Sequence, residues 1–413
     1  VGMVFQTLYY LVDLYFVGRL GDAAIAGLTG AGNVQFLIMA VTQVLGVGAM
    51  VLIAQACGRQ DREDANVVFN QTLALSALAA TATLVSGYVL ARVYMTTLAA
   101  DDDIVQAGVT YMWWFLPALG LQFALVSMGA ALRGTGVVNP TIVVQISTVM
   151  LNAILSPIMI AGWGTGRPLG IMGAGLSTSL SVAVAVVMML VYFVRLESYV
   201  RFDLRLMRPR RDVWTRIFAI GLPPGGEIAL LFAYLGIVFW TIRGFGPEAQ
   251  AGFGVGSRVM QAIFPPAMVV AFATAPVAGQ NMGAGRHDRV RETYRTAITG
   301  LAVIMLSLTL LCQWRPEALI AGFTDESAVI AIGAEFLRII SFNVLATGIV
   351  FTNSGMFQAM GNTMPALKAS ATRIVSFAVP AVLLTTYAGF ELWHLWWLSA
   401  VTVALQAVMS CWW

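Results

Sequence analysis

The stretch AQACGRQDRE at residues 54–63 returns in altered form as AGQNMGAGRHDR at residues 278–289. A shift of the whole sequence by 225 residues superimposes the two, and it holds without a gap from about residue 21 to residue 140. The matched pairs include Gln55 with Gln280, Gly58 with Gly283, Gly27 with Gly252, Gly108 with Gly333, Gly136 with Gly361 and Pro140 with Pro365. A match of this length indicates an internal duplication.

The composition excludes a soluble protein. Of the 413 residues, 59% are hydrophobic and 10% are charged, whereas a soluble domain has about 25% charged residues. The apolar segments recur along the whole chain, so a single cleaved secretory signal does not explain them. The sequence therefore predicts an integral membrane protein. It begins at Val1 and ends in VMSCWW, and we expect both terminal helices to be clipped.

Twelve mainly apolar stretches are each long enough to cross a bilayer as a helix, which takes about 20 residues. They lie at residues 1–19, 23–57, 66–94, 103–132, 139–162, 171–195, 214–242, 248–282, 290–314, 326–360, 364–388 and 392–413. The second, eighth and tenth are longer than a bilayer needs, so we expect them to tilt, bend or extend past the interface.

Arginines gather in alternate connections, such as Arg59 with Arg62 after the second span and Arg286 with Arg289 after the eighth. The positive-inside rule places these connections and both termini in the cytoplasm. An arginine-rich polar linker at 196–213 divides the chain. We therefore expect an N-lobe at 1–195 and a C-lobe at 214–413, with six helices each.

Because six is an even number, both halves enter the membrane in the same direction. The predicted fold is an all-α membrane protein with two six-helix lobes related by a parallel pseudo-twofold repeat, as in two-lobed secondary transporters. The sequence lacks a G-x-x-x-x-G-K-[ST] phosphate loop. We expect a transporter driven by an ion gradient and not an enzyme.

Several motifs resemble the multidrug and toxic compound extrusion (MATE) family, in its order and spacing. They are QTLYYLVDLYFVGRLGDAAIAG (6–27), AQACGRQDRE (54–63), ALRGTGVVNP (131–140), LNAILSPIMIAG (151–162), GFGPEAQAG (244–252), AGQNMGAGRHDR (278–289) and FQAMGNTMP (357–365). The DinF-like branch of that family is the candidate branch. The resemblance implies export of varied lipophilic, often cationic compounds in exchange for protons or sodium, by alternating access.

Asp13 interrupts the apolar run LYYLVDLYFVG at 8–18. A charge at the centre of a membrane helix costs about 2.5–3.5 kcal/mol on insertion scales, so it usually faces a cavity or binds an ion. The alternative is a structural carboxylate bonded to hydroxyls of a neighbouring helix. The resemblance favours an ion-linked role, because the family's aspartate falls at this position.

The resemblance also implies partners for Asp13 on the fifth and sixth spans. Asn152 matches the family's asparagine, Ser156 stands where one branch has a second aspartate, and Thr178 is our choice for a threonine. Sodium prefers several oxygen ligands, and a second carboxylate would help to neutralise it. A proton needs only one carboxyl group. We therefore favour proton coupling, with sodium at Asp13 and Asn152 as the only metal site expected and no resident cofactor.

Glu227, in IGLPPGGEIALLF, is a second candidate for coupling or substrate contact. Another branch of the family carries an ion-linked glutamate on this helix, which aligns near Leu231, one turn deeper. A glutamate in the first turn of a helix is also a common partner of the helix dipole, so both interpretations stay open. Further candidates for coupling or substrate contact are Gln35, Met39, Met260, Phe264 and Asn353.

Two rival functions remain. A flippase of a lipid-linked or amphiphilic metabolite usually carries several arginines and lysines in its cavity, and the only lysine here is Lys368. A receptor or channel would not need the duplication or Asp13. The expected setting is a bacterial inner membrane, with a monomeric protein that binds small lipophilic cations and no nucleic acid.

Overall fold

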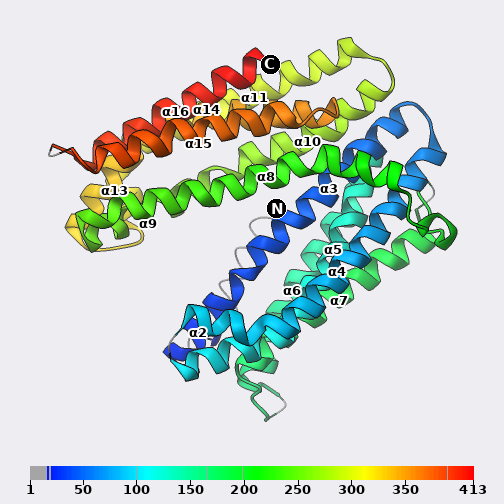
Figure 1. Ribbon diagram of the computed structural model, residues 1–413, viewed down its shortest axis with the longest axis horizontal. Coiled ribbons are helices and arrows are strands. Elements are labelled where there is room, and N and C mark those ends of the chain that lie inside the picture. The colour runs from blue at the N-terminus through cyan, green and yellow to red at the C-terminus, as the bar shows by residue number, and fades with distance from the viewer. Residues whose placement is uncertain (1–15, 18–19, 100, 165, 198, 388) are drawn as a thin grey trace. The chain divides into compact units, whose positions relative to one another are not determined.

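The computed structural model describes residues 16–17, 20–99, 101–164, 166–197, 199–387 and 389–413, and within these ranges the chain forms helices and no strands (Figure 1). Nine helices there are long and apolar enough to cross a membrane, and two bent helix pairs raise the number of spans to eleven. These spans coincide with the second to twelfth predicted ones. The first predicted span, 1–19, lies outside the described residues except for residues 16 and 17.

Two of the three overlong predicted spans, the eighth and the tenth, are bent, as expected from their length. They are the pairs α9 (Pro247–Ile263) with α10 (Pro265–Gly283) and α13 (Ser327–Ile340) with α14 (Phe342–Ala359). The last pair bends by 50° at Ser341. Bends of this kind let a long apolar stretch fit the thickness of the bilayer. The second span, which contains α2 (Asp22–Gly32) and α3 (Val34–Gly58), is one long helix over Ala23–Gly58.

The duplication is visible in the positions at which helices begin. In the first half α2, α4 (Arg62–Leu98), α5 (Asp102–Thr135) and α6 (Asn139–Ala161) begin at residues 22, 62, 102 and 139. In the second half α9, α11 (His287–Trp314), α13 and α15 (Met364–Leu384) begin at residues 247, 287, 327 and 364. Each start lies 225 residues after its counterpart, so the predicted repeat is confirmed.

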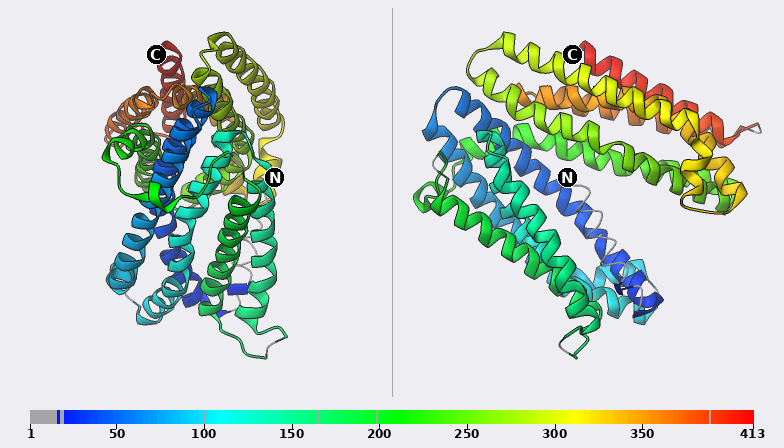
Figure 2. Two further views of the ribbon diagram at one scale, coloured as in Figure 1. Left: turned by 90° about the vertical axis from the view of Figure 1, so that its right-hand side faces the viewer. Right: turned by 180° about the vertical axis from the view of Figure 1, so that it is seen from behind.

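The remaining helices are α7 (Ile171–Arg195), η2 (Leu204–Met207), α8 (Arg211–Ile242), η3 (Arg243–Phe245), α12 (Pro316–Ala321) and α16 (Leu392–Trp412). The chain divides into two compact units, residues 1–221 and residues 222–413. In the first unit α5 contacts α2, α3, α4 and α7, and Figure 2 shows α5 running alongside α4 and α7. In the second unit α14 contacts α10, α11, α15 and α16.

Close helix contacts explain why the repeat preserves glycines. A Cβ atom on Gly27 would lie 2.7 Å from the backbone nitrogen of Gly108, so α2 and α5 approach each other too closely for a side chain. In the second unit, a Cβ atom on Gly252 would lie 3.3 Å from the backbone nitrogen of Gly333. The same glycine pair therefore holds the same two helices together in each half.

The surface of the first unit carries the apolar side chains that a bilayer requires. On α4, Leu78, Val85 and Val89 are 55%, 61% and 70% exposed. On α7, Val187 and Val194 are exposed in the same way. In water such a surface would be costly, whereas in hydrocarbon it is not. These helices therefore present a lipid-facing surface.

The predicted linker is fixed to α4 by buried amide side chains. Asn70 Nδ2 donates to the carbonyl of Arg201 (2.8 Å), and Asn70 Oδ1 accepts from the backbone N–H of Asp203 (2.9 Å). Gln71 Nε2 donates to the carbonyls of Leu206 and Arg208. Both amide side chains are fully buried. The linker is thus an ordered part of the first unit that packs on α4, which the sequence did not indicate.

Candidate functional site

The polar candidates of the N-lobe lie where α6 and α7 pack most closely. A Cβ atom on Gly173 of α7 would lie 2.5 Å from the carbonyl oxygen of Met159 on α6. Asn152 and Ser156 are four residues apart and therefore share one face of α6. This face meets Ser177 on α7. Small residues at a helix contact let the polar groups of the two helices reach each other.

The hydroxyl of Ser156 is the centre of this cluster. It donates to Asn152 Oδ1 at 3.3 Å, and its oxygen lies 3.3 Å from Ser177 Oγ. Asn152, Ser156 and Ser177 have no exposed surface. The cluster therefore offers neutral oxygen atoms in a water-poor interior.

Thr178 is buried beside the cluster, and one of its hydrogen bonds runs along its own helix. Its hydroxyl donates to the carbonyl of Ala174 at 3.0 Å. Ser177, which the sequence did not single out, provides the contact with α6. The sequence run LSTSLS pointed to a hydroxyl here but not to which one. A shift of one residue along a helix changes which side chain faces the neighbouring helix.

The amide nitrogen of Asn152 has an unusual environment. Nδ2 is buried and has no hydrogen-bond acceptor among the residues that the structure describes. A buried donor without an acceptor costs about 1–3 kcal/mol, and such groups are rare. Asp13, the predicted ion-linked residue, lies outside the described residues. The described part of the site thus presents one donor that is open to an acceptor.

The two halves differ at this site. The repeat shift of 225 residues places Thr148, Asn152 and Ser156 of α6 on Arg373, Phe377 and Ala381 of α15. Phe377 and Ala381 are fully buried and apolar. The second half therefore lacks the amide and the hydroxyl that Asn152 and Ser156 provide on α6, since apolar side chains occupy these two positions of α15.

The C-lobe contains a carboxylate within a membrane span. Glu227 lies about four turns into α8, at 3.6 residues per turn, and not in the first turn, so the helix-dipole explanation is wrong. Ser354 Oγ lies 3.5 Å from both carboxylate oxygens of Glu227, and Gln358 Nε2 lies 3.5 Å from the same hydroxyl. No ion pair involves Glu227 among the described residues. Its recorded partner is a neutral hydroxyl.

Asn353, another candidate, is occupied by contacts within the C-lobe. Its Oδ1 accepts from the hydroxyl of Tyr294 at 3.0 Å, and its Nδ2 donates to Ser410 Oγ at 2.9 Å. These bonds join α11, α14 and α16. The arrangement is that of a structural cross-link.

The four remaining candidates have different surroundings within their own units. On α3, Gln35 is half-buried and Met39 is 45% exposed. On α9, Met260 is buried in the apolar core of the second unit, and Phe264 packs against that core. The 225-residue shift pairs Gln35 with Met260 and Met39 with Phe264. The paired residues nevertheless differ in their surroundings.

Arg373 on α15 is a polar group that the sequence interpretation missed. Its guanidinium carbon lies 4.6 Å from the ring centroid of Tyr234 on α8. Its Nε is buried without an acceptor among the described residues. Such residues within a span usually mark a functional position. The available signal was a single arginine inside the apolar segment KASATRIVSFAV.

Comparison with known proteins agrees with this architecture. The MatE family profile matches residues 1–158 and 223–383. The chain is 24% identical over 401 residues to "Probable multidrug resistance protein YoeA" of Bacillus subtilis (strain 168), covering 95% of this chain and 86% of that protein. It is 24% identical over 372 residues to "Multidrug export protein MepA" of Staphylococcus aureus (strain N315), covering 87% and 79%.

Solved structures show the same fold. A MOP superfamily transporter from Pyrococcus furiosus, described as having a binding pocket of reverse polarity, superimposes with a TM-score of 0.90 at 23% identity, over 99% of this chain and 91% of that one. A MATE transporter in its bent conformation gives 0.92 at 24% identity, over 99% and 90%. The profile covers most of the chain and both halves of the repeat. The chain therefore belongs to the MatE family.

Proposed function

We propose that this protein is an antiporter that exports lipophilic, often cationic compounds by alternating access, with protons as the coupling ion. Family membership and the names of the relatives from Bacillus subtilis and Staphylococcus aureus support multidrug export. The observation that carries the choice of ion is the buried cluster of Asn152, Ser156 and Ser177, in which every oxygen is neutral.

The chemistry of this cluster favours a proton over sodium. A sodium ion needs several oxygen ligands and gains from a second negative charge, yet Ser156 provides only a hydroxyl at the position where a second carboxylate would help. A proton is held by one carboxyl group, and a water-poor environment favours its neutral form. We assign that carboxyl group to Asp13.

Protonation gives this site two states. An ionised carboxylate of Asp13 only accepts hydrogen bonds, whereas the protonated group also donates one. Asn152 Nδ2 offers a donor, and the hydroxyls of Ser156 and Ser177 can act either way. Each protonation state thus favours a different hydrogen-bond arrangement of α6 and α7. A proton from outside shifts the conformational equilibrium towards substrate release.

Orientation completes the proposal. The arginine-rich connections indicate that the linker and both termini are cytoplasmic. Bacterial relatives of similar length support an inner-membrane setting. Export then uses the inward proton gradient of a bacterial cell.

Arg373 favours one alternative, a flippase or exporter of a lipid-linked or amphiphilic anion. Its guanidinium lies in a membrane span without an ion pair among the described residues. A phosphate or carboxylate of a substrate would neutralise it. The Arg373→Gln variant separates the two functions. It abolishes transport of an anion and leaves export of a lipophilic cation unchanged or faster.

The proposal is tested with purified full-length protein in liposomes that contain a fluorescent lipophilic cation. A proton gradient and a sodium gradient are imposed separately on wild type and on Asp13→Asn. The proposal requires transport driven by protons alone and lost in the variant. Transport driven by sodium alone contradicts the assigned ion, and absence of transport with either gradient favours the alternative function.

A further inference from the structure

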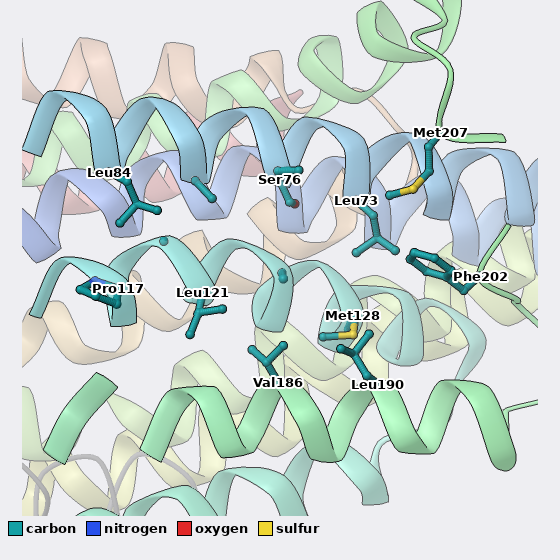
Figure 3. Close-up of a pocket in the computed structure, with 14 residues that line it drawn as sticks. Leu73, Ser76, Leu84, Pro117, Leu121, Met128, Val186, Leu190, Phe202 and Met207 are labelled. Atoms are coloured by element: carbon teal, nitrogen blue, oxygen red, sulfur yellow. The ribbon is translucent and has the colours of Figure 1, made fainter. Parts of the chain in front are cut away.

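The first unit contains an apolar groove that the transport cycle above does not use (Figure 3). Its volume is about 480 Å³, and it is lined by side chains of α4, α5, α7 and the linker. Ser76 is its only polar lining residue, and its hydroxyl is already bonded to Ser127 at 2.6 Å. The groove therefore suits a hydrocarbon ligand.

The groove is as long as one acyl chain. Along α4 its lining extends from Leu73 to Leu84, which is about 16 Å at 1.5 Å per residue. Along the antiparallel α5 it extends from Met128 to Pro117, over the same length. One leaflet is half of the hydrocarbon core, or about 15 Å. Ala77 on α4 is exposed, so the groove is open at the side.

The linker lines one end of the groove. Phe202 and Met207 lie beside Leu73 and Leu190 at that end of the close-up (Figure 3). Directly next to them in the chain are Arg201 and Arg208. The groove therefore ends beneath a basic segment.

Buried amide side chains fix the backbone of this basic segment. The carbonyl of Arg201 accepts from Asn70, its N–H donates to Asn66 Oδ1 at 2.6 Å, and the carbonyl of Arg208 accepts from Gln71. The segment is thus anchored to the same helix, α4, that forms a wall of the groove. Its position relative to the groove is set by the fold.

The arginine side chains of this segment are available for a ligand. Arg201, Arg205 and Arg208 are exposed. None of the three forms an ion pair among the described residues, and the nearby Asp203 accepts from the backbone N–H of Arg205. Basic pockets at the ends of membrane helices bind anionic headgroups.

We infer that this groove binds an anionic diacyl phospholipid, with one acyl chain between α4, α5 and α7 and the phosphate on Arg201, Arg205 and Arg208. The length of the apolar groove and the positive charge at one end of it select the same ligand. An acyl chain without the phosphate leaves the arginines unpaired, and a soluble phosphate leaves the groove empty.

The test measures lipid binding by native mass spectrometry of the full-length protein in detergent. Phosphatidylglycerol and phosphatidylcholine with identical dioleoyl chains are titrated separately. Two variants address the two parts of the site. Arg201→Gln/Arg205→Gln/Arg208→Gln removes the charge, and Ala77→Phe fills the groove from an exposed position. Thermal unfolding of each variant checks the fold.

Two control variants make the same kinds of substitution at positions outside the groove and the linker. Arg286→Gln/Arg291→Gln/Arg295→Gln removes the same charge from exposed positions of the second unit, and Val89→Phe enlarges an exposed residue of α4 outside the groove. Wild type and both controls should retain one phosphatidylglycerol in preference to phosphatidylcholine.

The charge variant should lose that preference by about fivefold for each arginine, since each basic residue contributes about 1 kcal/mol. The groove variant should lose the bound lipid of either headgroup. Unchanged phosphatidylglycerol binding in Ala77→Phe, or equal losses in the two arginine variants, would overturn the assignment. Equal retention of both lipids by wild type would do the same.

Discussion

Ser156 Oγ lies 3.3 Å from Asn152 Oδ1, one turn away on the same buried face of α6. A hydroxyl in this position completes a hydrogen-bond network without adding charge. The choice between a serine and an aspartate at this position therefore changes the charge of the N-lobe cluster, and under the proposed function it selects the coupling ion.

Replacement of Ser156 by aspartate should change ion preference. A second carboxylate beside Asn152 supplies the negative charge that a sodium site lacks, and it repels the first carboxylate unless a cation lies between them. We expect sodium-driven accumulation of a lipophilic cation to rise by at least about tenfold, equivalent to about 1.4 kcal/mol. Accumulation in liposomes under a sodium gradient measures this. Ser156→Asn is the isosteric neutral control, and an equal rise in both variants would refute a charge effect.

The close contact of Gly173 with Met159 should be essential for the packing of α6 against α7. A methyl group at Gly173 would lie 2.5 Å from a backbone carbonyl, so α6 and α7 must separate. We expect Gly173→Ala to lower the unfolding midpoint by roughly 3–10 °C, as overpacking does. Thermal unfolding in detergent checks this. Gly300→Ala on α11, where a Cβ atom meets nothing within 4 Å, is the matched control; its midpoint should stay the same or rise slightly, since alanine favours a helix more than glycine does.

Glu227 should contribute less to coupling than Asp13. Its recorded partner is the hydroxyl of Ser354, and a glutamine can accept the same hydrogen bond. We expect Glu227→Gln to keep proton-driven export within about threefold of wild type, less than 0.7 kcal/mol. Initial rates in liposomes test this, with Glu248→Gln at the start of α9 as a control. A loss as complete as that of Asp13→Asn would move the proton site to the C-lobe.

The hydrogen bonds from the side chain of Gln71 to the linker backbone, here called the amide clamp, should protect the linker from proteolysis. Gln71 Nε2 donates to the carbonyl of Arg208 at 2.6 Å and Gln71 Oε1 accepts from the backbone N–H of Arg210 at 3.0 Å, each worth about 1 kcal/mol. In Gln71→Ala, limited trypsin digestion should cleave after the linker arginines at least about fivefold faster. Gln106→Ala, at an exposed position of α5, should digest at the wild-type rate. Equal rates in the two variants would show that the clamp contributes nothing to local stability.

The sequence predicted the fold well, because length and apolar composition alone specify a membrane helix. The 225-residue spacing that relates the glycines of the two halves also relates the first residues of the corresponding helices. The glycine pair Gly27 and Gly108 shows why, since a close backbone contact accepts no other residue. The bends between α9 and α10 and at Ser341 followed from excess length, but their positions depend on neighbouring helices.

The sites were harder to predict, because side-chain direction depends on the neighbouring helix. The run LSTSLS offers several hydroxyls, and packing against α6 selects Ser177. Depth along the repeat suggested Met260 and Phe264 as candidates for substrate contact, whereas Met260 lies in the core of the second unit and the half-buried Phe264 packs against that core. The surroundings of Arg373 could not be predicted, because its ring contact is with Tyr234, which lies 139 residues earlier in the chain.

The most direct test of the account is the internal pH of liposomes during export. Wild-type protein is reconstituted without sodium around a trapped pH-sensitive dye, and a lipophilic cation is added to one side. If Asp13 carries the coupled proton, protons flow opposite to the cation in wild type, and this proton flow is lost in Asp13→Asn. Export of the cation with no change in internal pH would contradict the account.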